Sequence, residues 1–145
     1  MFKMEGRNAS LPPKVAVLVY DGLCTFEYGI VIEVLGLHRP EVGGYLYDVC
    51  SVSLEGDKLS AAGGLIINAD GDEIDFLSAD IIVIPGWRDK DAEVPERLVN
   101  HIAKAHHRGV KLVSICSGIY VLAAAGILDG RKATTHWRCV DDFNT

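Results

Sequence analysis

The chain has 145 residues, of which 49% are hydrophobic, so one domain with a substantial apolar core is expected. Twenty acidic residues against fourteen basic ones give a net charge of -6, which repels a phosphate backbone and argues against DNA binding by this chain itself. No segment has the roughly 18 uninterrupted apolar residues of a membrane span, and the amino terminus lacks a signal-peptide pattern, so a cytoplasmic protein with no membrane contact is predicted.

The first elements follow a polar start. Residues 1–13 end in Pro12-Pro13 and are predicted to be a disordered leader, with the folded domain covering 14–145. "KVAVLVY" begins at Lys14 and is a β-branched run typical of a strand buried on both faces of a parallel sheet. After the turn "DGLCT", Thr25 is predicted to cap a helix over residues 26–38.

The rest of the chain alternates between strand and helix patterns. Strands are predicted at 45–53, 79–87 and 110–116, and helices at 94–109 and 118–126. A peripheral pair of short strands is predicted at 59–70, pivoting on Gly63-Gly64. A turn with a short extended piece is predicted at 128–137. This alternation predicts an α/β fold with an open, mostly parallel, flavodoxin-like sheet flanked by helices. The carboxyl ends of its strands bring "CTFE", "PGW" and "CSG" to one edge.

Cys116 lies where the strand in "KLVSICSGIYVLAAAG" must turn into a helix. A nucleophile at such an elbow needs small residues two positions away on each side, and Ser114 and Gly118 meet that need. The amide of Ser117 would then face the sulfur as an oxyanion donor, and the start of the following helix would favour the thiolate. The alternative is that Cys116 fills space at the end of a core strand.

Two further residues supply acid–base chemistry. Glu27, after the first strand, and His136, late in the chain, are a carboxyl group and an imidazole that could move protons near such a sulfur. Each also has a structural interpretation, Glu27 as a carboxylate in the first turn of a helix and His136 as a buried, hydrogen-bonded histidine.

Other candidates are weaker. The four cysteines are widely scattered, so free thiols are predicted, with Cys24 either a resolving thiol for Cys116 or a packed bystander. His101, His106 and His107 lack the offset of four that places two imidazoles on one helical face, so a solvated helix face is predicted and no metal site. No Gly-rich phosphate loop opens a helix, and no cofactor is expected.

The motifs "VLVYDGLCTFE", "DIIVIPGW", "SICSG" and "GRKATTHW", in this order, resemble the ThiJ/PfpI family of the class I glutamine amidotransferase-like superfamily. The resemblance implies that Cys116 is the elbow cysteine, that a protonated Glu27 hydrogen-bonds its thiolate, and that His136 lies nearby. It also implies that the amides of Gly86, Trp87 and Ser117 form the oxyanion pocket. Trp137 follows His136 where a carboxylate would complete a triad, which argues against peptidase activity.

Within the family, the stretches "YDGLCTFEYGIVIEVLGLHRPE" and "SICSGIYVLAAAGILDGRKATTHWR" are most similar to the amino-terminal domain of FtrA-like AraC-type transcriptional regulators. This implies a ligand- or signal-sensing domain that forms a homodimer, takes a small molecule of unknown identity, and touches DNA only through a helix-turn-helix region outside this chain. We therefore expect a fragment, incomplete at its C-terminal end. The alternatives are a cysteine-dependent enzyme acting on a small electrophile, like the isocyanide hydratases, and a redox or aldehyde-stress sensor in which Cys116 is oxidised.

Overall fold

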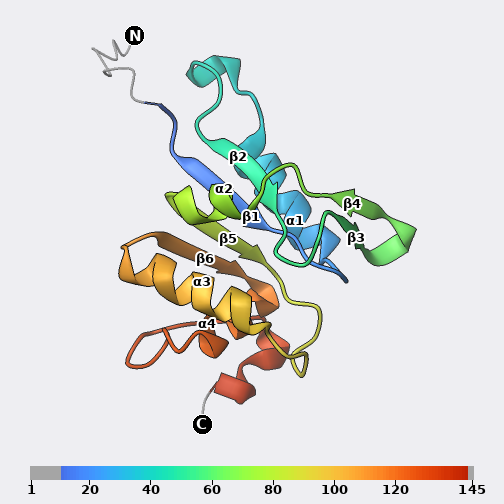
Figure 1. Cartoon of the computed structure of the whole chain (residues 1–145), viewed down its shortest axis with the longest axis vertical. Helices are drawn as coiled ribbons and strands as arrows, with labels where there is room; N and C mark the ends of the chain where they lie inside the picture. The colour runs from blue at the N-terminus through green and yellow to red at the C-terminus, as the bar shows by residue number, and fades with distance from the viewer. Residues whose placement is uncertain (1–10, 144–145) are drawn as a thin grey trace.

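The computed structural model describes residues 11–143, and its centre is a sheet of four parallel strands in the order β2-β1-β5-β6 (Figure 1). The strands are β1 (Lys14–Leu18), β2 (Asp48–Val52), β5 (Ile81–Pro85) and β6 (Lys111–Ile115). The inner strands β1 and β5 are buried along nearly their whole length, because helices cover both faces of the sheet. The predicted fold class is confirmed.

Alternate residues of the strands pack into two separate cores. Val15 and Val17 of β1 meet Val31 of α1 (Thr25–Val31) on one face. Ala16 and Leu18 belong to the larger core on the other face, which is covered by α2 (Glu73–Ser78), α3 (Glu96–His107) and α4 (Ile119–Ala124). The sheet is thus the middle layer between α1 and the other helices (Figure 1).

The pair of short strands predicted at 59–70 is present as an antiparallel hairpin that projects from the side of the sheet (Figure 1). Strands β3 (Lys58–Ser60) and β4 (Ile66–Asn68) are joined through a tight 3-10 turn. Gly63 and Gly64 have φ angles of 75° and 77° in that turn, a region that only glycine enters without strain. The predicted pivot is confirmed.

The helix predicted at 26–38 is present, but its N-cap and its C-terminal half differ from the prediction. α1 ends at Val31 and continues as a π-helical segment over Ile32–Gly36. Cys24, and not Thr25, is the N-cap residue, and it makes no side-chain capping bond. The prediction that Thr25 caps this helix is therefore wrong.

Helix α2 was not predicted. It has six residues, of which only Phe76 is buried, so it carries too little apolar periodicity to be seen in the sequence. Its start is fixed by a capping box, in which the Asp72 carboxylate accepts from the amide of Asp75 and the Asp75 carboxylate accepts from the amide of Asp72.

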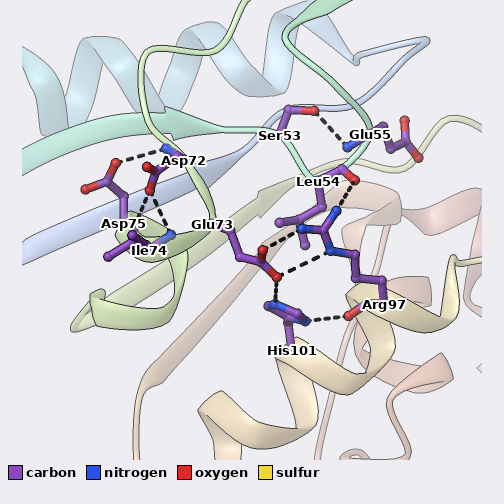
Figure 2. A network of polar contacts seen from close by, with 9 residues as sticks. All are labelled: Ser53, Leu54, Glu55, Asp72, Glu73, Ile74, Asp75, Arg97 and His101. Carbon is purple, nitrogen blue, oxygen red and sulfur yellow. Dashed lines mark hydrogen bonds and ion pairs between the residues drawn. The ribbon is translucent and has the colours of Figure 1, made fainter.

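A polar network joins α2 to α3 (Figure 2). Arg97 donates two hydrogen bonds to the Glu73 carboxylate, at 2.6 and 3.3 Å, and these bonds, followed by the one from His101, lower the pKa of Glu73. Nε2 of His101 lies 2.6 Å from Glu73 Oε1, and its Nδ1 lies 2.7 Å from the Arg97 carbonyl oxygen. The His101 side chain is only 11% exposed, so the prediction that it lies on a solvated helix face is wrong.

The chain after β6 is mostly irregular. A 3-10 turn over Cys116–Gly118 precedes α4, residues 131–136 have no regular structure, and two further 3-10 turns follow at Trp137–Cys139 and Asp141–Phe143. The last turn is held to α4 by the Tyr120 hydroxyl, which donates to Asp142 at 2.6 Å.

The N-terminal residues and the lengths of the helices bear on the predicted leader and on the predicted absence of a membrane span. Of the leader predicted for residues 1–13, residues 1–10 lie outside the described part, and residues 11–13 are exposed and irregular. Among residues 11–143, no helix has the length and apolar character needed to cross a bilayer.

Candidate functional site

The backbone turns sharply at Cys116, directly after β6. Its φ angle is 56°, and no other non-glycine residue among 11–143 has a positive φ. Such a conformation costs on the order of 1–3 kcal/mol and persists only where its surroundings enforce it. A Cβ atom on Gly118 would lie 2.3 Å from the carbonyl oxygen of Ile84, so only glycine fits at that position. The predicted elbow is therefore present, and so is its need for a glycine at position 118.

The elbow brings the sulfur of Cys116 to the carboxyl group of Glu27. Glu27 lies in the first turn of α1, Cys116 follows β6, and both residues are half-buried. Burial and then the hydrogen bond with Glu27 raise the pKa of the Cys116 thiol, while a hydrogen bond from the backbone amide of Ser117 lowers it. Sulfur, carboxyl group and amide thus meet in one place, as the sequence predicted.

The balance of these effects differs from the prediction that the following helix favours the thiolate. The net direction of the pKa of Cys116 is upward, so desolvation and the neighbouring carboxylate outweigh the amide. The residues directly after the sulfur form a 3-10 turn, and α4 has only six residues. This upward direction runs against the predicted preference for the thiolate, which stays a prediction.

Of the three amides predicted for an oxyanion pocket, only that of Ser117 faces the sulfur. The amide of Gly86 donates to the carbonyl oxygen of Ile115 at 3.0 Å, and that of Trp87 donates to Ser117 Oγ at 2.9 Å. Gly86 and Trp87 are both buried. Their role as oxyanion donors stays a prediction, and it would require these bonds to open.

His136 is the N-cap residue of the 3-10 turn over Trp137–Cys139, and its ring is engaged there. Nδ1 accepts a bond from the amide of Arg138 at 3.3 Å, and the ring lies 5.6 Å from that of Trp137. No hydrogen bond among the described residues joins His136 to Cys116. Its predicted part in proton transfer remains a prediction.

Thr135, which the sequence reasoning missed, is the residue of this segment that reaches the elbow. Its hydroxyl donates to the carbonyl oxygen of Cys116 at 3.0 Å. The bond fixes the peptide unit that follows the strained φ angle. The hydroxyl group in "ATTHW" was the available signal, but nothing in the sequence says which carbonyl it meets.

Cys24 and Tyr20 form a wall against the end of β5, through contacts with Trp87 and Pro85. The Cys24 thiol donates to the carbonyl oxygen of Trp87 at 3.6 Å, and the Tyr20 hydroxyl donates to that of Pro85 at 2.9 Å. Burial raises the pKa of Tyr20, so it remains a neutral phenol. A Cβ atom on Gly86 would lie 2.7 Å from the sulfur of Cys24, which shows how closely this wall approaches β5.

Two cavities lie away from the elbow. One, of about 450 Å³, lies at the outer edge of β2, and the other, of about 370 Å³, lies between α3, β6 and α4. Neither is lined by Cys116 or Glu27. Within residues 11–143, no group of three or more His, Cys, Asp or Glu side chains is placed to hold a metal ion.

Known proteins with similar sequences include regulators and enzymes. The HTH-type transcriptional regulator GbdR of Pseudomonas aeruginosa is 26% identical over 136 residues, which are 94% of this chain but 36% of the regulator. An uncharacterized protein in the cpoL 5' region of Streptomyces lividans is 31% identical over 128 residues, 88% of this chain and 89% of that protein. The deglycase TK1284 of Thermococcus kodakarensis is 32% identical over 132 residues, 89% of this chain and 75% of that enzyme.

The fold is shared with solved structures. An AraC family transcriptional regulator from Pseudomonas putida superposes with a TM-score of 0.76 at 19% identity, covering 90% of this chain and 70% of that one. The chain spans only about a third of the length of GbdR, which it resembles as an amino-terminal regulator domain. The DJ-1/PfpI family model matches residues 13–145, a range that contains both the elbow at Cys116 and its partner Glu27, and the chain therefore belongs to the DJ-1/PfpI family.

Proposed function

We propose that this chain is the sensing domain of an AraC-type transcriptional regulator, and that DNA is read by a helix-turn-helix region outside these 145 residues. The observation that carries the proposal is the similarity to the transcriptional regulator GbdR, which extends over 94% of this chain. Burial and Glu27 raise the pKa of the Cys116 thiol, a direction that suits a binding or sensing group better than a nucleophile.

The test compares the full-length gene product with the 145-residue chain in DNA binding. Because the chain has a net charge of -6, we expect it not to shift DNA from the region upstream of its gene, whereas the full-length protein shifts this DNA in a salt-dependent manner. A coding frame that ends soon after residue 145 with no helix-turn-helix region contradicts the proposal, as does DNA binding by the short chain alone.

We also propose that the domain works as a homodimer. A stripe of exposed apolar side chains follows α1 and its π-helical continuation, made of Phe26, Ile30 and Val34 at helical spacing and of Leu37 directly after the last helical residue. Two copies related by a two-fold axis would bury such a stripe against itself.

Val34 is 57% exposed and lies in the middle of the stripe, so Val34→Glu is expected to weaken self-association at least tenfold without unfolding the domain. Sedimentation equilibrium measures the change, with Val42→Glu as the control, because Val42 is 55% exposed but lies outside the stripe. A wild-type protein that is monomeric at all concentrations contradicts the dimer.

A cysteine-dependent enzyme acting on a small electrophile is the second candidate. It is favoured by the hydrogen bond between Glu27 and Cys116 and by the 32% identity to a deglycase. In this function Cys116 would attack an electrophilic carbon, and Glu27 would accept the thiol proton and return it later. The direction in which Glu27 moves the pKa of Cys116 distinguishes the two candidates.

A further inference from the structure

Arg88 follows the end of β5 and lies against two aromatic rings. Its guanidinium carbon is 4.5 Å from the centre of the Trp87 ring and 5.5 Å from that of the Tyr20 ring. The two rings lie 4.9 Å apart, and both residues are buried. A cation over the face of an aromatic ring is attracted to it, and more strongly where water is excluded. Arg88 therefore rests on a fixed aromatic surface.

An ion pair with Glu55 holds the guanidinium group of Arg88 in this position. Nη2 of Arg88 donates to Oε1 of Glu55, while Oε2 of Glu55 accepts the amide of Asp21 at 3.1 Å. The side chains of Arg88 and Glu55 are 28% and 24% exposed, so water screens the pair only in part. Because Asp21 lies in the turn between β1 and α1, the pair connects that turn to the end of β5.

The placement of Arg88 leaves its Nε atom buried without a partner. Among residues 11–143, this is the only buried side-chain nitrogen or oxygen atom that makes no hydrogen bond. A buried donor without an acceptor lowers the stability of the folded state, so such groups are rare in proteins. This cost favours a role for Arg88 other than stabilising the domain.

The peptide unit between Trp87 and Arg88 connects Arg88 to the elbow. The amide of Trp87 donates to Ser117 Oγ at 2.9 Å, and Ser117 Oγ donates to the carbonyl oxygen of Trp87 at 3.2 Å. That carbonyl group shares a rigid peptide plane with the backbone nitrogen of Arg88. The position of Arg88 therefore constrains the acceptor that holds the Ser117 hydroxyl.

Ser117 passes this constraint to the sulfur. Its hydroxyl is bonded to Trp87, and its backbone amide is bonded to the sulfur of Cys116. A shift of the Ser117 main chain would move both groups together. The amide lowers the pKa of the Cys116 thiol, against burial and Glu27, so its position affects how easily the thiol ionises.

We propose that Arg88 is a positioning residue for the elbow. Held by Glu55 on the ring of Trp87, Arg88 fixes the peptide unit that binds the Ser117 hydroxyl. Through Ser117 it keeps the backbone amide directed at the sulfur of Cys116. The inference goes beyond the proposed regulatory function, because it concerns the reactivity of Cys116 in either candidate function.

The test measures alkylation of Cys116 by iodoacetamide over a series of pH values, in the 145-residue chain and in the full-length protein. In Arg88→Gln the Ser117 amide is held less firmly. The midpoint of the rate profile is therefore expected to rise by about half a pH unit, and the rate at pH 7 to fall about threefold. The rate at high pH, where the thiol is ionised, is expected to stay the same. Arg88→Lys keeps the charge but not the planar group, so it is expected to restore part of the shift.

A purely structural role of Arg88 predicts a different profile. An elbow that is merely loosened exposes the sulfur, so Cys116 reacts faster at every pH with the same midpoint. That result overturns the proposal, and so does a profile of Arg88→Gln that is identical to that of the wild type.

Glu55→Gln is an independent variant that keeps Arg88. Glutamine retains an oxygen that accepts the amide of Asp21, but it removes the negative charge that holds the guanidinium group. The midpoint is expected to rise as in Arg88→Gln, and the double variant is expected to show no larger shift than Arg88→Gln alone. Fully additive shifts show that the two residues act separately and overturn the proposal.

Ser117→Ala shows whether Arg88 acts through the Ser117 hydroxyl. This substitution removes both bonds of the hydroxyl to Trp87, so Arg88→Gln is expected to cause no further shift in its presence. An equal shift with and without the hydroxyl overturns the proposal. Arg138→Gln is the matched control, because Arg138 lies over the exposed ring of Trp137 at 5.0 Å, and the profile is expected to stay unchanged.

The two proposals fail separately. A full-length protein that binds DNA but whose Cys116 profile ignores Arg88 removes the positioning role and leaves the regulatory function. A profile that depends on Arg88, in a protein without a DNA-reading region, removes the regulatory function and leaves the positioning role.

Discussion

Replacement of Glu27 by glutamine is expected to lower the pKa of the Cys116 thiol. Glu27 is the largest influence after burial that keeps this pKa high, through a hydrogen bond and through its charge. Glutamine keeps the size of the side chain but removes the negative charge that disfavours a thiolate beside it. We expect several-fold faster alkylation of Cys116 by iodoacetamide at pH 7, because the thiolate is the reacting form.

The measurement follows Cys116 alone. The chain has three other cysteines, so the modified peptide is quantified by mass spectrometry over a series of pH values, and the midpoint of the rate profile gives the pKa. Glu33→Gln is the control, because Glu33 is exposed on the π-helical continuation of α1 and is not among the groups that act on Cys116.

Slower alkylation of Cys116 in Glu27→Gln would support the enzymatic function. The resemblance to the ThiJ/PfpI family implies a protonated glutamate that donates to a thiolate. The amide N–H of glutamine is a weaker donor, so this substitution then raises the pKa of the thiol and slows alkylation. A slower reaction in Glu27→Gln would therefore show that the carboxyl group activates the sulfur. The sensing proposal would then lose the support that it takes from the pKa of Cys116.

Gly118→Ala is expected to be among the most destabilising single substitutions in the chain. The new Cβ atom would lie 2.3 Å from the carbonyl oxygen of Ile84 and 3.2 Å from its carbonyl carbon. Both atoms belong to the backbone of β5, an inner strand, so the clash cannot be relieved by rotating a side chain. We expect a loss of about 3 kcal/mol or more in the free energy of unfolding, at the upper end of overpacking costs.

Urea unfolding followed by circular dichroism measures this loss, with Gly29→Ala as the matched control. Gly29 lies within α1, and no atom outside its own helix lies within 4 Å of the position its Cβ would take. That substitution is expected to stabilise the domain by roughly 0.5–1 kcal/mol through helix propensity. If the two variants unfold at the same urea concentration, the close approach of the elbow to β5 is not a constraint in solution.

The parts of the fold that the sequence predicts well are those governed by local pattern. The runs at 14–20 and 79–87 predict buried strands because a strand covered on both faces needs apolar side chains at nearly every position. The run at 110–116 also forms a strand, but the prediction that it is buried is wrong, because β6 lies at the edge of the sheet and none of its residues is buried. α2 escaped prediction because six residues with one buried side chain leave no periodic signal. Its capping box carries aspartate at the third helical position, where glutamate or glutamine is the usual signal.

The sequence predicts the residues that meet at the elbow, but it does not predict the direction in which the pKa of Cys116 is shifted. The spacing of Cys116 and Gly118 predicts an elbow because the steric need for glycine is local. The direction of the thiol pKa depends on burial and on Glu27, which lies 89 positions earlier in the chain, and no local pattern encodes it. The same holds for Thr135 and for the amides of Gly86 and Trp87, whose partners are set by tertiary contacts.

β6 is an edge strand of the sheet, which affects how the 145-residue chain behaves in solution. Its outward backbone groups pair with no other strand of residues 11–143, and the side chain of Val113 in its centre is 42% exposed. An uncovered, partly apolar strand is a template onto which another polypeptide can add by main-chain hydrogen bonds. Concentrated solutions of these 145 residues are therefore prone to aggregate edge to edge, and a charged substitution at Val113 is the simplest way to keep them dispersed.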